Sequence, residues 1–418
     1  MARTFAALLS KLVRTGNLEV ETADGGRHRV GDGAGPKLGV RLADRAAEWA
    51  LLSDPAFSLG ELYMDGRIVV TEGALYDLLD LAARNFAQIE ALPWIKAVES
   101  ARVFFRSLHQ RNDRRRAKDN VARHYDHDRR IYDFFLDADR QYSCAYFEHS
   151  GQPLDDAQRA KKRHIAAKLL VDEDASVLDI GCGFGGMALY LAGVAGAGKA
   201  TGVTLSEEQI AVARARAERS GFAERLDFRL QDYRDVNERF DRIVSVGMFE
   251  HVGVNRYDEF FQTVRRLLED SGVMLLHSIG RNSVPAATNA WIRKYIFPGG
   301  YIPSLSEVLP AIERAGLFVT DIEILRLHYA DTLRAWRERF LAHWDEVAKV
   351  SGERFCRMWE FYLAGSETSF RVDAHMVFQI QLAKRQDAAP LTRDYILERE
   401  DALRRNEAER PLLRQAAE

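Results

Sequence analysis

A glycine-rich string between two apolar stretches is the pattern with the clearest chemistry in this chain of 418 residues. It spans residues 178–186 and reads LDIGCGFGG. Glycines between a strand and a helix let the backbone approach a bound ligand without a Cβ clash. Gly181, Gly183 and Gly186 satisfy the G-x-G-x-x-G dinucleotide pattern, which alone is weak evidence. Asp179 favours a ligand that carries an ammonium group, because its carboxylate would repel a pyrophosphate.

The string resembles the first motif of class I S-adenosylmethionine methyltransferases, so we expect that cofactor to bind near Asp179, Gly181 and Gly183. Many such enzymes end the second strand with an acidic residue that binds the ribose, but here the strand ends in Thr204. Thr204 and Gln209 both offer donor and acceptor atoms and can hydrogen-bond the ribose instead. The missing acidic residue also counts against a dinucleotide fold.

Two residues after the third expected strand are candidates for adenine binding. Asp232 can accept a hydrogen bond from the adenine amino group, and Tyr233 can cover the ring. The alternative for Asp232 is a helix or turn cap, which aspartate prefers.

The motif must be positioned by strands and helices that alternate from about residue 122 onward. Alternation of this kind predicts an α/β fold, a doubly wound and mostly parallel sheet with ligands at the carboxyl ends of the strands. Helices are expected after the first, second and fourth strands, at 186–193, 206–220 and 256–268. The five expected strands are 176–180, 200–204, 226–230, 240–246 and 272–277.

The chain divides into four expected segments. Residues 1–100 read as a smaller mixed α+β domain, associated with lipid or membrane. An alternating run precedes a turn at Asp24-Gly25-Gly26, and a second turn at Asp65-Gly66 lies between apolar runs. Residues 101–121 form a basic linker, 122–390 the catalytic domain, and 391–418 a charged C-terminal helix or tail. Residues 101–118 contain seven basic residues and one acidic residue, a local net charge of +6. This segment is either a solvated helical linker or a surface for anionic lipid head groups.

Composition excludes several classes of protein. The 62 acidic and 59 basic residues nearly balance, which argues against a nucleic-acid binder. Cys144, Cys182 and Cys356 are widely spaced and form no metal-ligand pattern, so no metal and a reducing cytoplasm are expected. No stretch approaches the roughly 20 apolar residues of a membrane span, and the N-terminus lacks a complete signal peptide.

Five further strings together resemble the cyclopropane-fatty-acyl-phospholipid synthase family. Their order and spacing fit over about residues 122–384, and the N-terminal region is similar to the extra domain of the longer bacterial members. The strings are QYSCAYF (141–147), SVGMFEHVG (245–253), LLHSIG (275–280), WIRKYIFPGGYIPS (291–304) and LHYADTL (327–333).

The resemblance implies transfer of a methyl group from S-adenosylmethionine to a cis double bond in an unsaturated phospholipid. A carbocation remains, a base removes a proton from the added methyl, and a cyclopropane ring closes. Family members bind bicarbonate, thought to be that base. The matching positions for contact with the ion are Cys144, Glu250, His277, Tyr329 and the backbone at Ile279, and Tyr142 and Ser143 match positions that contact the methyl donor.

The residue types suit these roles, with alternatives for several of them. Glu250 can accept from the bicarbonate hydroxyl or can itself be the base, and an unpaired charge in its apolar surroundings is costly without a function. His277 can donate to the ion, although a histidine ending an apolar strand is commonly a satisfied core residue. Tyr329 can donate or simply pack at an interface. Cys144 is expected to contact the ion and not to act as a nucleophile.

Two rival functions remain from the sequence. Deprotonation elsewhere on the same scaffold would give a methylene branch, and later reduction would give a methyl branch. A non-catalytic lipid-binding module is the other rival, disfavoured because Glu250, Gly181 and Gly183 are all present. By analogy with the longer family members we expect a homodimer that binds the inner membrane surface transiently.

Overall fold

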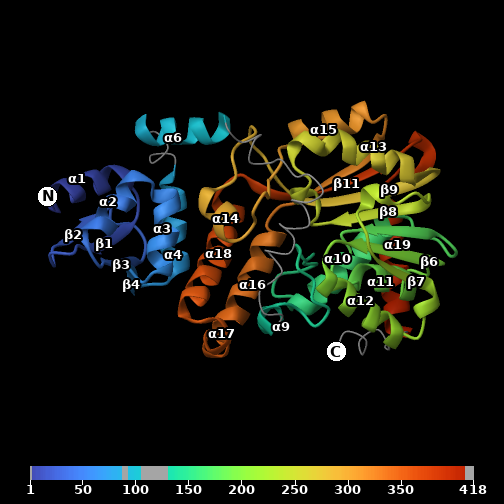
Figure 1. Cartoon of the computed structure of the whole chain (residues 1–418), viewed down its shortest axis with the longest axis horizontal. Coiled ribbons are helices and arrows are strands. Elements are labelled where there is room, and N and C mark those ends of the chain that lie inside the picture. Colours follow the sequence, from blue (N-terminus) through green and yellow to red (C-terminus); the bar gives the residue numbers. More distant parts are fainter. Residues whose placement is uncertain (1, 87–92, 105–129, 410–418) are drawn as a thin grey trace. The chain divides into compact units, whose positions relative to one another are not determined.

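The computed structural model describes residues 2–86, 93–104 and 130–409, which form two compact units (Figure 1). The N-terminal unit comprises Met1–His109, Ala286–Pro298 and Leu333–His375. The C-terminal unit comprises Gln110–Pro285, Gly299–Thr332 and Met376–Glu418. The glycine-rich string lies in the C-terminal unit.

The C-terminal unit is built on a sheet of seven strands in the order β10-β11-β9-β8-β5-β6-β7. The pairs β7–β6, β6–β5, β5–β8 and β8–β9 are parallel, and β10 and β11 pair antiparallel at one edge. The predicted doubly wound, mostly parallel sheet is therefore confirmed. The strands are β5 (Ser176–Ile180), β6 (Lys199–Thr204), β7 (Leu226–Leu230), β8 (Phe240–Val246), β9 (Leu268–Arg281), β10 (Phe318–Leu325) and β11 (His375–Ala383).

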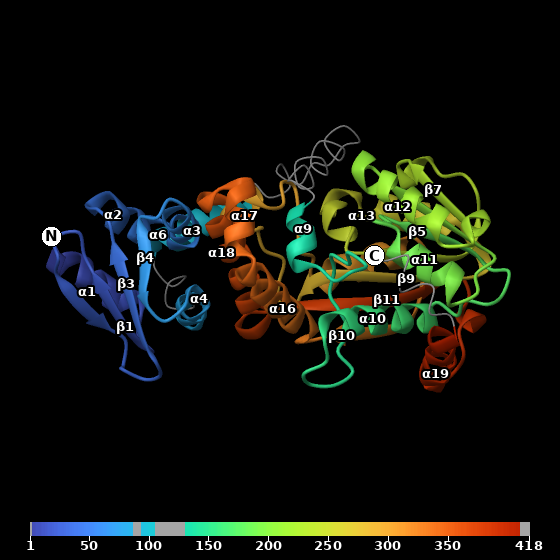
Figure 2. The same ribbon diagram turned by 90° about the horizontal axis from the view of Figure 1, so that it is seen from below.

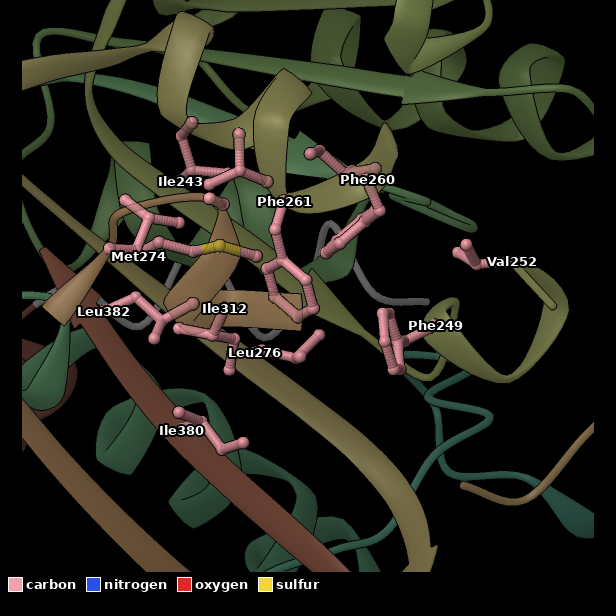
Figure 3. Close-up of a cluster of buried hydrophobic side chains, with 14 of the residues drawn as sticks. Ile243, Phe249, Val252, Phe260, Phe261, Met274, Leu276, Ile312, Ile380 and Leu382 are labelled. Carbon is pink, nitrogen blue, oxygen red and sulfur yellow. The ribbon is translucent and has the colours of Figure 1, made fainter. Parts of the chain in front are cut away.

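Helices cover both faces of this sheet (Figures 1 and 2). On one face α10 (Leu154–Lys168), α11 (Gly186–Gly193) and α19 (Asp394–Glu409) share an apolar core with β5, and α12 (Glu207–Arg219) shares another with α11 and β6. On the opposite face lie α13 (Tyr257–Leu267) and α15 (Leu305–Arg314). Figure 3 shows Phe260 and Phe261 of α13 and Ile312 of α15 among side chains of β8, β9 and β11.

Local sequence accounts for the helix starts nearest the glycine-rich string. Gly185 has φ 83°, a left-handed conformation suited to glycine, and α11 begins at the next residue. Ser206 caps α12 by accepting a hydrogen bond from Gln209 N at 3.2 Å. The ends of β5 and β6 are therefore followed at once by helices, as the pattern predicted. A short helix, α9 (Arg130–Phe135), precedes the loop that leads to α10.

The N-terminal unit has a sheet of four strands in the order β2-β1-β3-β4. The predicted turn at Asp24-Gly25 joins β1 to β2, which pair antiparallel. The segment before Asp65, read as an apolar run, is the helix α3, whose residues Gly60, Leu62 and Met64 are buried. The elements are α1 (Ala2–Leu12), β1 (Asn17–Glu21), β2 (Arg27–Val30), β3 (Lys37–Leu42), α2 (Arg45–Ser53), α3 (Pro55–Met64), β4 (Ile68–Glu72), α4 (Leu75–Arg84), α6 (Pro93–Phe104), α14 (Ala290–Tyr295), α17 (Trp344–Ser351) and α18 (Glu353–Val372), with most of α16 (His328–Ala342).

The compact units differ from the sequence segments 1–100 and 122–390, because two later segments belong to the N-terminal unit. Within that unit Trp291 of α14 packs on Phe361 of α18, with ring centroids 4.7 Å apart. Long-range packing of this kind leaves no mark in local composition. Most of the basic linker 101–121 lies outside the described residues, but Arg102 is described and donates to Asp54 at 2.6 Å.

The C-terminal helix α19 is held by buried polar contacts as well as by apolar packing. Glu407 of α19 accepts from Arg163 of α10 and from the Tyr190 hydroxyl of α11, both at 2.6 Å. The Arg163 side chain is 6% exposed, so its charge has little access to water. The expected charged C-terminal helix is thus a part of the fold through residue 409.

We predict that Glu407→Ala lowers the free energy of unfolding by about 2 kcal/mol, because it leaves a buried guanidinium with one fewer acceptor. Glu148 still pairs with Arg163 and limits the loss. Glu409→Ala, at an exposed position of the same helix, is the matched control and should change stability by less than about 0.5 kcal/mol. Urea unfolding followed by circular dichroism measures both, and equal losses would contradict the assignment.

Candidate functional site

The glycine-rich string turns sharply at the carboxyl end of β5. Gly181 and Gly183 have φ of 81° and 54°, which side chains rarely adopt. A Cβ at Gly181 would lie 2.8 Å from the Met248 side chain, so the turn also needs glycine for space. No atom lies within 4 Å of the corresponding position at Gly183. The turn therefore presents bare backbone beside open space, as a ligand-binding turn requires.

Asp179, on β5 just before this turn, is a buried carboxylate without enough partners. Its side chain is 2% exposed, and its Oδ2 atom has no hydrogen-bond partner. Burial raises the pKa of Asp179 to about 7, and the Lys161 ammonium opposes that rise. A cation bound at Oδ2 would relieve the cost of burying this charge.

The carboxyl end of β6 carries Thr204 and Gln209, both buried. Thr204 Oγ1 donates to Gln209 Oε1 at 2.9 Å, so the two side chains are already held together. Their predicted role in ribose binding fits this place beside the glycine turn, since β5 and β6 are neighbours. The role itself stays a prediction.

After β7, Asp232 takes the capping role that was the alternative to adenine binding. Its Oδ1 accepts from Arg234 N at 3.0 Å, and the Arg234 guanidinium engages both carboxylate oxygens at 2.9 and 2.6 Å. Tyr233 packs edge-on against Phe260, with centroids 5.5 Å apart. Both residues lie one strand beyond Thr204, and their contact with adenine stays a prediction.

The loop that carries Tyr142, Ser143 and Cys144 is anchored by Lys161 of α10. The fully buried Lys161 ammonium donates to Gln141 Oε1 at 2.7 Å and to Ser143 Oγ at 2.8 Å. Burial lowers the pKa of Lys161 to about 8, with Asp137 opposing. Tyr142 meets Tyr132 edge-on at 5.6 Å. Ser143 also approaches the turn after β8, because a Cβ at Gly247 would lie 3.7 Å from it.

Glu250 lies in a short helical turn after β8 and reaches the neighbouring strand β9. Its Oε1 accepts from Ile279 N at 2.6 Å, whereas its buried Oε2 has no partner. Burial raises the pKa of Glu250 to about 7, and the Ile279 hydrogen bond opposes that rise. Ile279 was predicted to contact the ion through its backbone, and a direct contact would have to share the N–H that Glu250 already holds.

His277, on β9, is a buried and neutral imidazole. Its side chain is 2% exposed, and burial lowers its pKa well below the usual value. The Gln379 side chain lies 3.2 Å from its Nδ1. His277 lies two residues before Ile279, so its side chain and the Glu250 carboxylate meet the same end of β9.

The loop that carries Cys144 is bonded to the first turn of α16, which carries Tyr329. Ala145 N donates to Thr332 Oγ1 at 3.0 Å, and Phe147 N donates to His328 Nδ1 at 3.0 Å. Both Cys144 and Tyr329 are buried, at 1% and 7% exposure. Burial raises the pKa of the Cys144 thiol well above its usual range, so the group stays protonated, which agrees with a contact role and not a nucleophilic one.

Lys161 is the residue that sequence reasoning missed. It acts electrostatically on Asp179, on Cys144 and on His277, and so faces both the glycine turn and the predicted anion contacts. The string AKKRHIAAK of α10 reads as a solvated basic helix. The alanines of this helix were the one sign in the sequence that it is buried, since Ala157, Ala160 and Ala167 are all buried where α10 packs closely on its neighbours.

Among residues 2–86, 93–104 and 130–409, no three His, Cys, Asp or Glu side chains are grouped to hold a metal ion. In the same part of the chain, no helix is long and apolar enough to cross a membrane.

The strand order, the glycine turn after β5 and the unpaired Asp179 define a class I S-adenosylmethionine-dependent methyltransferase. A family model described as mycolic acid cyclopropane synthetase matches residues 112–380. Together with the relatives described next, this match shows that the chain belongs to the cyclopropane synthase family, and the resemblance seen in the sequence is confirmed.

The cyclopropane-fatty-acyl-phospholipid synthase of Escherichia coli (strain K12) is 37% identical over 334 residues, which cover 80% of this chain and 85% of that protein. The tuberculostearic acid methyltransferase UfaA1 of Mycobacterium tuberculosis is 33% identical over 403 residues, 92% of each chain. The crystal structure of mycolic acid cyclopropane synthase CmaA1 complexed with SAH and CTAB has a TM-score of 0.60 at 33% identity, and covers 63% of this chain and 97% of that one.

We predict that Glu250→Gln stabilises the C-terminal unit at alkaline pH. A carboxyl with a folded pKa of about 7 and an ordinary value of 4.5 contributes stability below pH 4.5 that is lost as pH rises through 7. The amide keeps the acceptor for Ile279 N and carries no charge. The variant should therefore match the wild type near pH 4.5 and exceed it by about 3 kcal/mol at pH 8.

All six tryptophans lie in the N-terminal unit, so tryptophan fluorescence would follow the unfolding of that unit and not of the C-terminal unit. Urea unfolding is instead followed by hydrogen exchange of β8 and β9 at both pH values. A stability difference that does not change with pH would refute the buried carboxylate.

Proposed function

We propose that this enzyme adds one carbon from S-adenosylmethionine to the cis double bond of unsaturated phospholipid acyl chains and closes a cyclopropane ring, with bound bicarbonate assisting proton removal. The observation that carries the proposal is a pair of buried carboxylate oxygens without partners, Asp179 Oδ2 and Glu250 Oε2. Asp179 lies near the end of β5 and Glu250 follows the adjacent strand β8, at the edge where ligands of this fold bind.

The residues around Asp179 fit S-adenosylmethionine. Asp179 Oδ2 offers an acceptor for the amino group, and Gly181 and Gly183 leave the backbone bare. When bound, S-adenosylmethionine supplies an electrophilic methyl group. Tyr142 and Ser143 would contact this donor from the loop that Lys161 anchors, whereas the ribose and adenine roles fall to Thr204, Gln209, Asp232 and Tyr233.

The residues around Glu250 fit bicarbonate, an anion that also donates one hydrogen bond. Glu250 Oε2 is an acceptor, which suits the bicarbonate hydroxyl but would repel a fully deprotonated carbonate. His277 and Tyr329 can donate to the other oxygens, and Cys144 can contact the ion as a neutral thiol. When bound, bicarbonate supplies a basic oxygen inside an apolar site without a permanently buried side-chain charge.

The surroundings of Glu250 exclude water, which protects a carbocation from hydroxide. Phe249 beside it is fully buried and stacks on Tyr257 at 4.4 Å, in the apolar cluster of Figure 3. The faces of Tyr142 and Tyr329 would add electrostatic stabilisation through their ring quadrupoles.

A second candidate product is a methylene- or methyl-branched acyl chain. One relative that aligns over 92% of this chain bears the name methyltransferase, and another bears the name cyclopropane synthase. The buried set of Glu250, His277, Cys144 and Tyr329 favours ring closure, because it gathers acceptors and donors around one anion.

Docking on anionic lipid at the cytoplasmic face of the inner membrane and assembly as a homodimer belong to this proposal. The sequence supports docking through the net charge of +6 over residues 101–118. Arg102, the first basic residue of that segment, forms an ion pair with Asp54, so we do not include it among the residues proposed to bind lipid.

We predict that vesicles of unsaturated phospholipid incubated with the enzyme and S-adenosylmethionine yield acyl chains heavier by one methylene group. The product should resist hydrogenation, as a ring does. Glu250→Gln should lower the rate of its formation by roughly 100-fold or more, since a neutral amide replaces the carboxylate that accepts from the bicarbonate hydroxyl. Mass spectrometry before and after hydrogenation makes the measurement. Glu259→Gln on the exposed side of α13 is the control and should keep full activity.

A hydrogenatable product would replace ring closure by methylene branching on the same scaffold. No added carbon with any unsaturated lipid would leave the non-catalytic lipid-binding module as the better description.

We also predict that S-adenosylmethionine binding releases a proton. Asp179 is largely protonated below pH 7 in the free protein, and an ammonium partner favours its carboxylate. Affinity should therefore fall about tenfold per pH unit below pH 7, and calorimetry in buffers of different ionisation enthalpy should detect release near pH 6 but not at pH 8. Asp179→Asn should abolish the linkage, whereas Glu250→Gln should keep it. Release that persists in Asp179→Asn would assign the proton elsewhere.

A further inference from the structure

The imidazole of His277 is hydrogen-bonded to a series of buried polar side chains that have no role in the reaction as described above. His277 Nδ1 lies 3.2 Å from Gln379 Nε2, and Gln379 Oε1 accepts from Lys168 Nζ at 2.9 Å. Gln379 and Lys168 are fully buried, and His277 is 2% exposed. Gln379 lies on β11, the neighbour of β9 in the sheet.

The orientation of the Gln379 amide follows from Lys168. A lysine ammonium has three donors and no acceptor, so it can face only the amide oxygen. Lys168 also forms an ion pair with Glu323, which opposes the lowering of the Lys168 pKa by burial. Burial would raise the pKa of Glu323, but His164 and Lys168 hold it well below its usual range. The amide NH2 must then face His277.

The tautomer of His277 follows from the amide. Gln379 Nε2 only donates, so His277 Nδ1 must accept and carries no proton. Three cationic or titratable groups, Lys161, Lys168 and His164, act on His277 and disfavour its protonation, which agrees with a neutral ring. The single ring proton is therefore on Nε2.

We propose that Gln379 is a positioning residue that locks His277 in the Nε2–H tautomer, so that its remaining nitrogen donates to the anion beside Glu250. Its role as anion donor rests on the proposed function, whereas the tautomer rests on the hydrogen bonds alone. Lys168 and Glu323 set the amide, and the amide sets the imidazole. The nitrogen opposite the hydrogen-bonded one decides what a histidine can do in a site.

The same series of hydrogen-bonded side chains continues beyond Lys168 to α10 and α19. Glu323 Oε2 lies 2.7 Å from His164 Nε2, and His164 Nδ1 lies 2.5 Å from Glu400 Oε1 of α19. The four inner members of the series, Gln379, Lys168, Glu323 and His164, each have a partner on both sides. Such fully satisfied networks hold one geometry, so the amide of Gln379 has little freedom to flip.

The experiment compares Gln379→Glu with the wild type. A carboxylate at this position accepts from Lys168 and from His277 Nδ1–H, and so moves the ring proton to Nδ1 without a change of size. The tautomer is read from ¹⁵N shifts of histidine-labelled protein, with His277 assigned by its absence from the spectrum of His277→Gln. Gln379→Met, which removes both hydrogen bonds, is the second variant and should lose the Nε2–H preference.

Gln381→Glu is the matched control. Gln381 is equally buried on β11 but donates to Lys168 O at 2.5 Å and to the Tyr395 hydroxyl at 2.8 Å, not to His277. It should leave the His277 tautomer and the bicarbonate dependence of activity unchanged. Gln379→Glu should weaken the apparent bicarbonate affinity by roughly 10- to 100-fold, the usual effect of losing the partner that orients a ligating histidine, and should leave S-adenosylmethionine affinity unchanged.

The outcomes separate the two claims. A proton on Nδ1 in the wild type, or one that stays on Nε2 in Gln379→Glu, overturns the inference. A tautomer that moves while bicarbonate dependence stays the same upholds the lock but overturns the anion site in the proposed function.

Discussion

The burial of the basic residues of α10 is the constraint on which the rest of the C-terminal unit depends. Lys161, Arg163, His164 and Lys168 are all at most 5% exposed, and an unpaired cation at such depth would be very costly. Every one of them therefore has a polar or acidic partner, supplied by the 141–147 loop, by β10 and β11, and by α19. Because those partners come from elements far apart in sequence, pairing the four side chains fixes the loop, the edge strands and the C-terminal helix together.

The two carboxylates of the site differ from these paired side chains. Asp179 and Glu250 each keep one buried oxygen without a hydrogen bond, and burial raises both pKa values to about 7. The same fold gives each of the four buried basic side chains of α10 a partner. Buried carboxylates with a raised pKa and no hydrogen-bond partner are found most often at functional sites. At such sites a loss of stability is accepted in exchange for ligand binding.

The sequence determined the parts of the fold that depend on local pattern. The ranges 176–180, 226–230 and 240–246 were predicted to the residue. Apolar runs or alternating apolar residues of that length, between turn and helix signals, are typical of strands. The antiparallel pair β10 and β11 was not predicted, and β9 runs beyond the expected 272–277 at both ends. The burial of the basic residues of α10 was not predicted, because the same sequence could form a solvated helix or a buried one whose charged side chains are all paired. Asp232 shows the converse limit, because capping and ligand binding use the same residue type at the same place.

Under the proposed function, Lys161 links the residues proposed to contact the cofactor with those proposed to contact the anion. Its ammonium donates to Ser143, opposes the rise that burial causes in the pKa of Asp179, and acts on Cys144 and His277. One charge therefore acts on both groups of residues. In the free protein that charge is shared between Asp179 and the neighbouring Asp137 and Asp139. Under the proposed function, a cationic donor at Asp179 satisfies that carboxylate and frees the field of Lys161 for an anion. Under this proposal the methyl donor and the anion each favour binding of the other, so the base would be held best when the methyl donor is present.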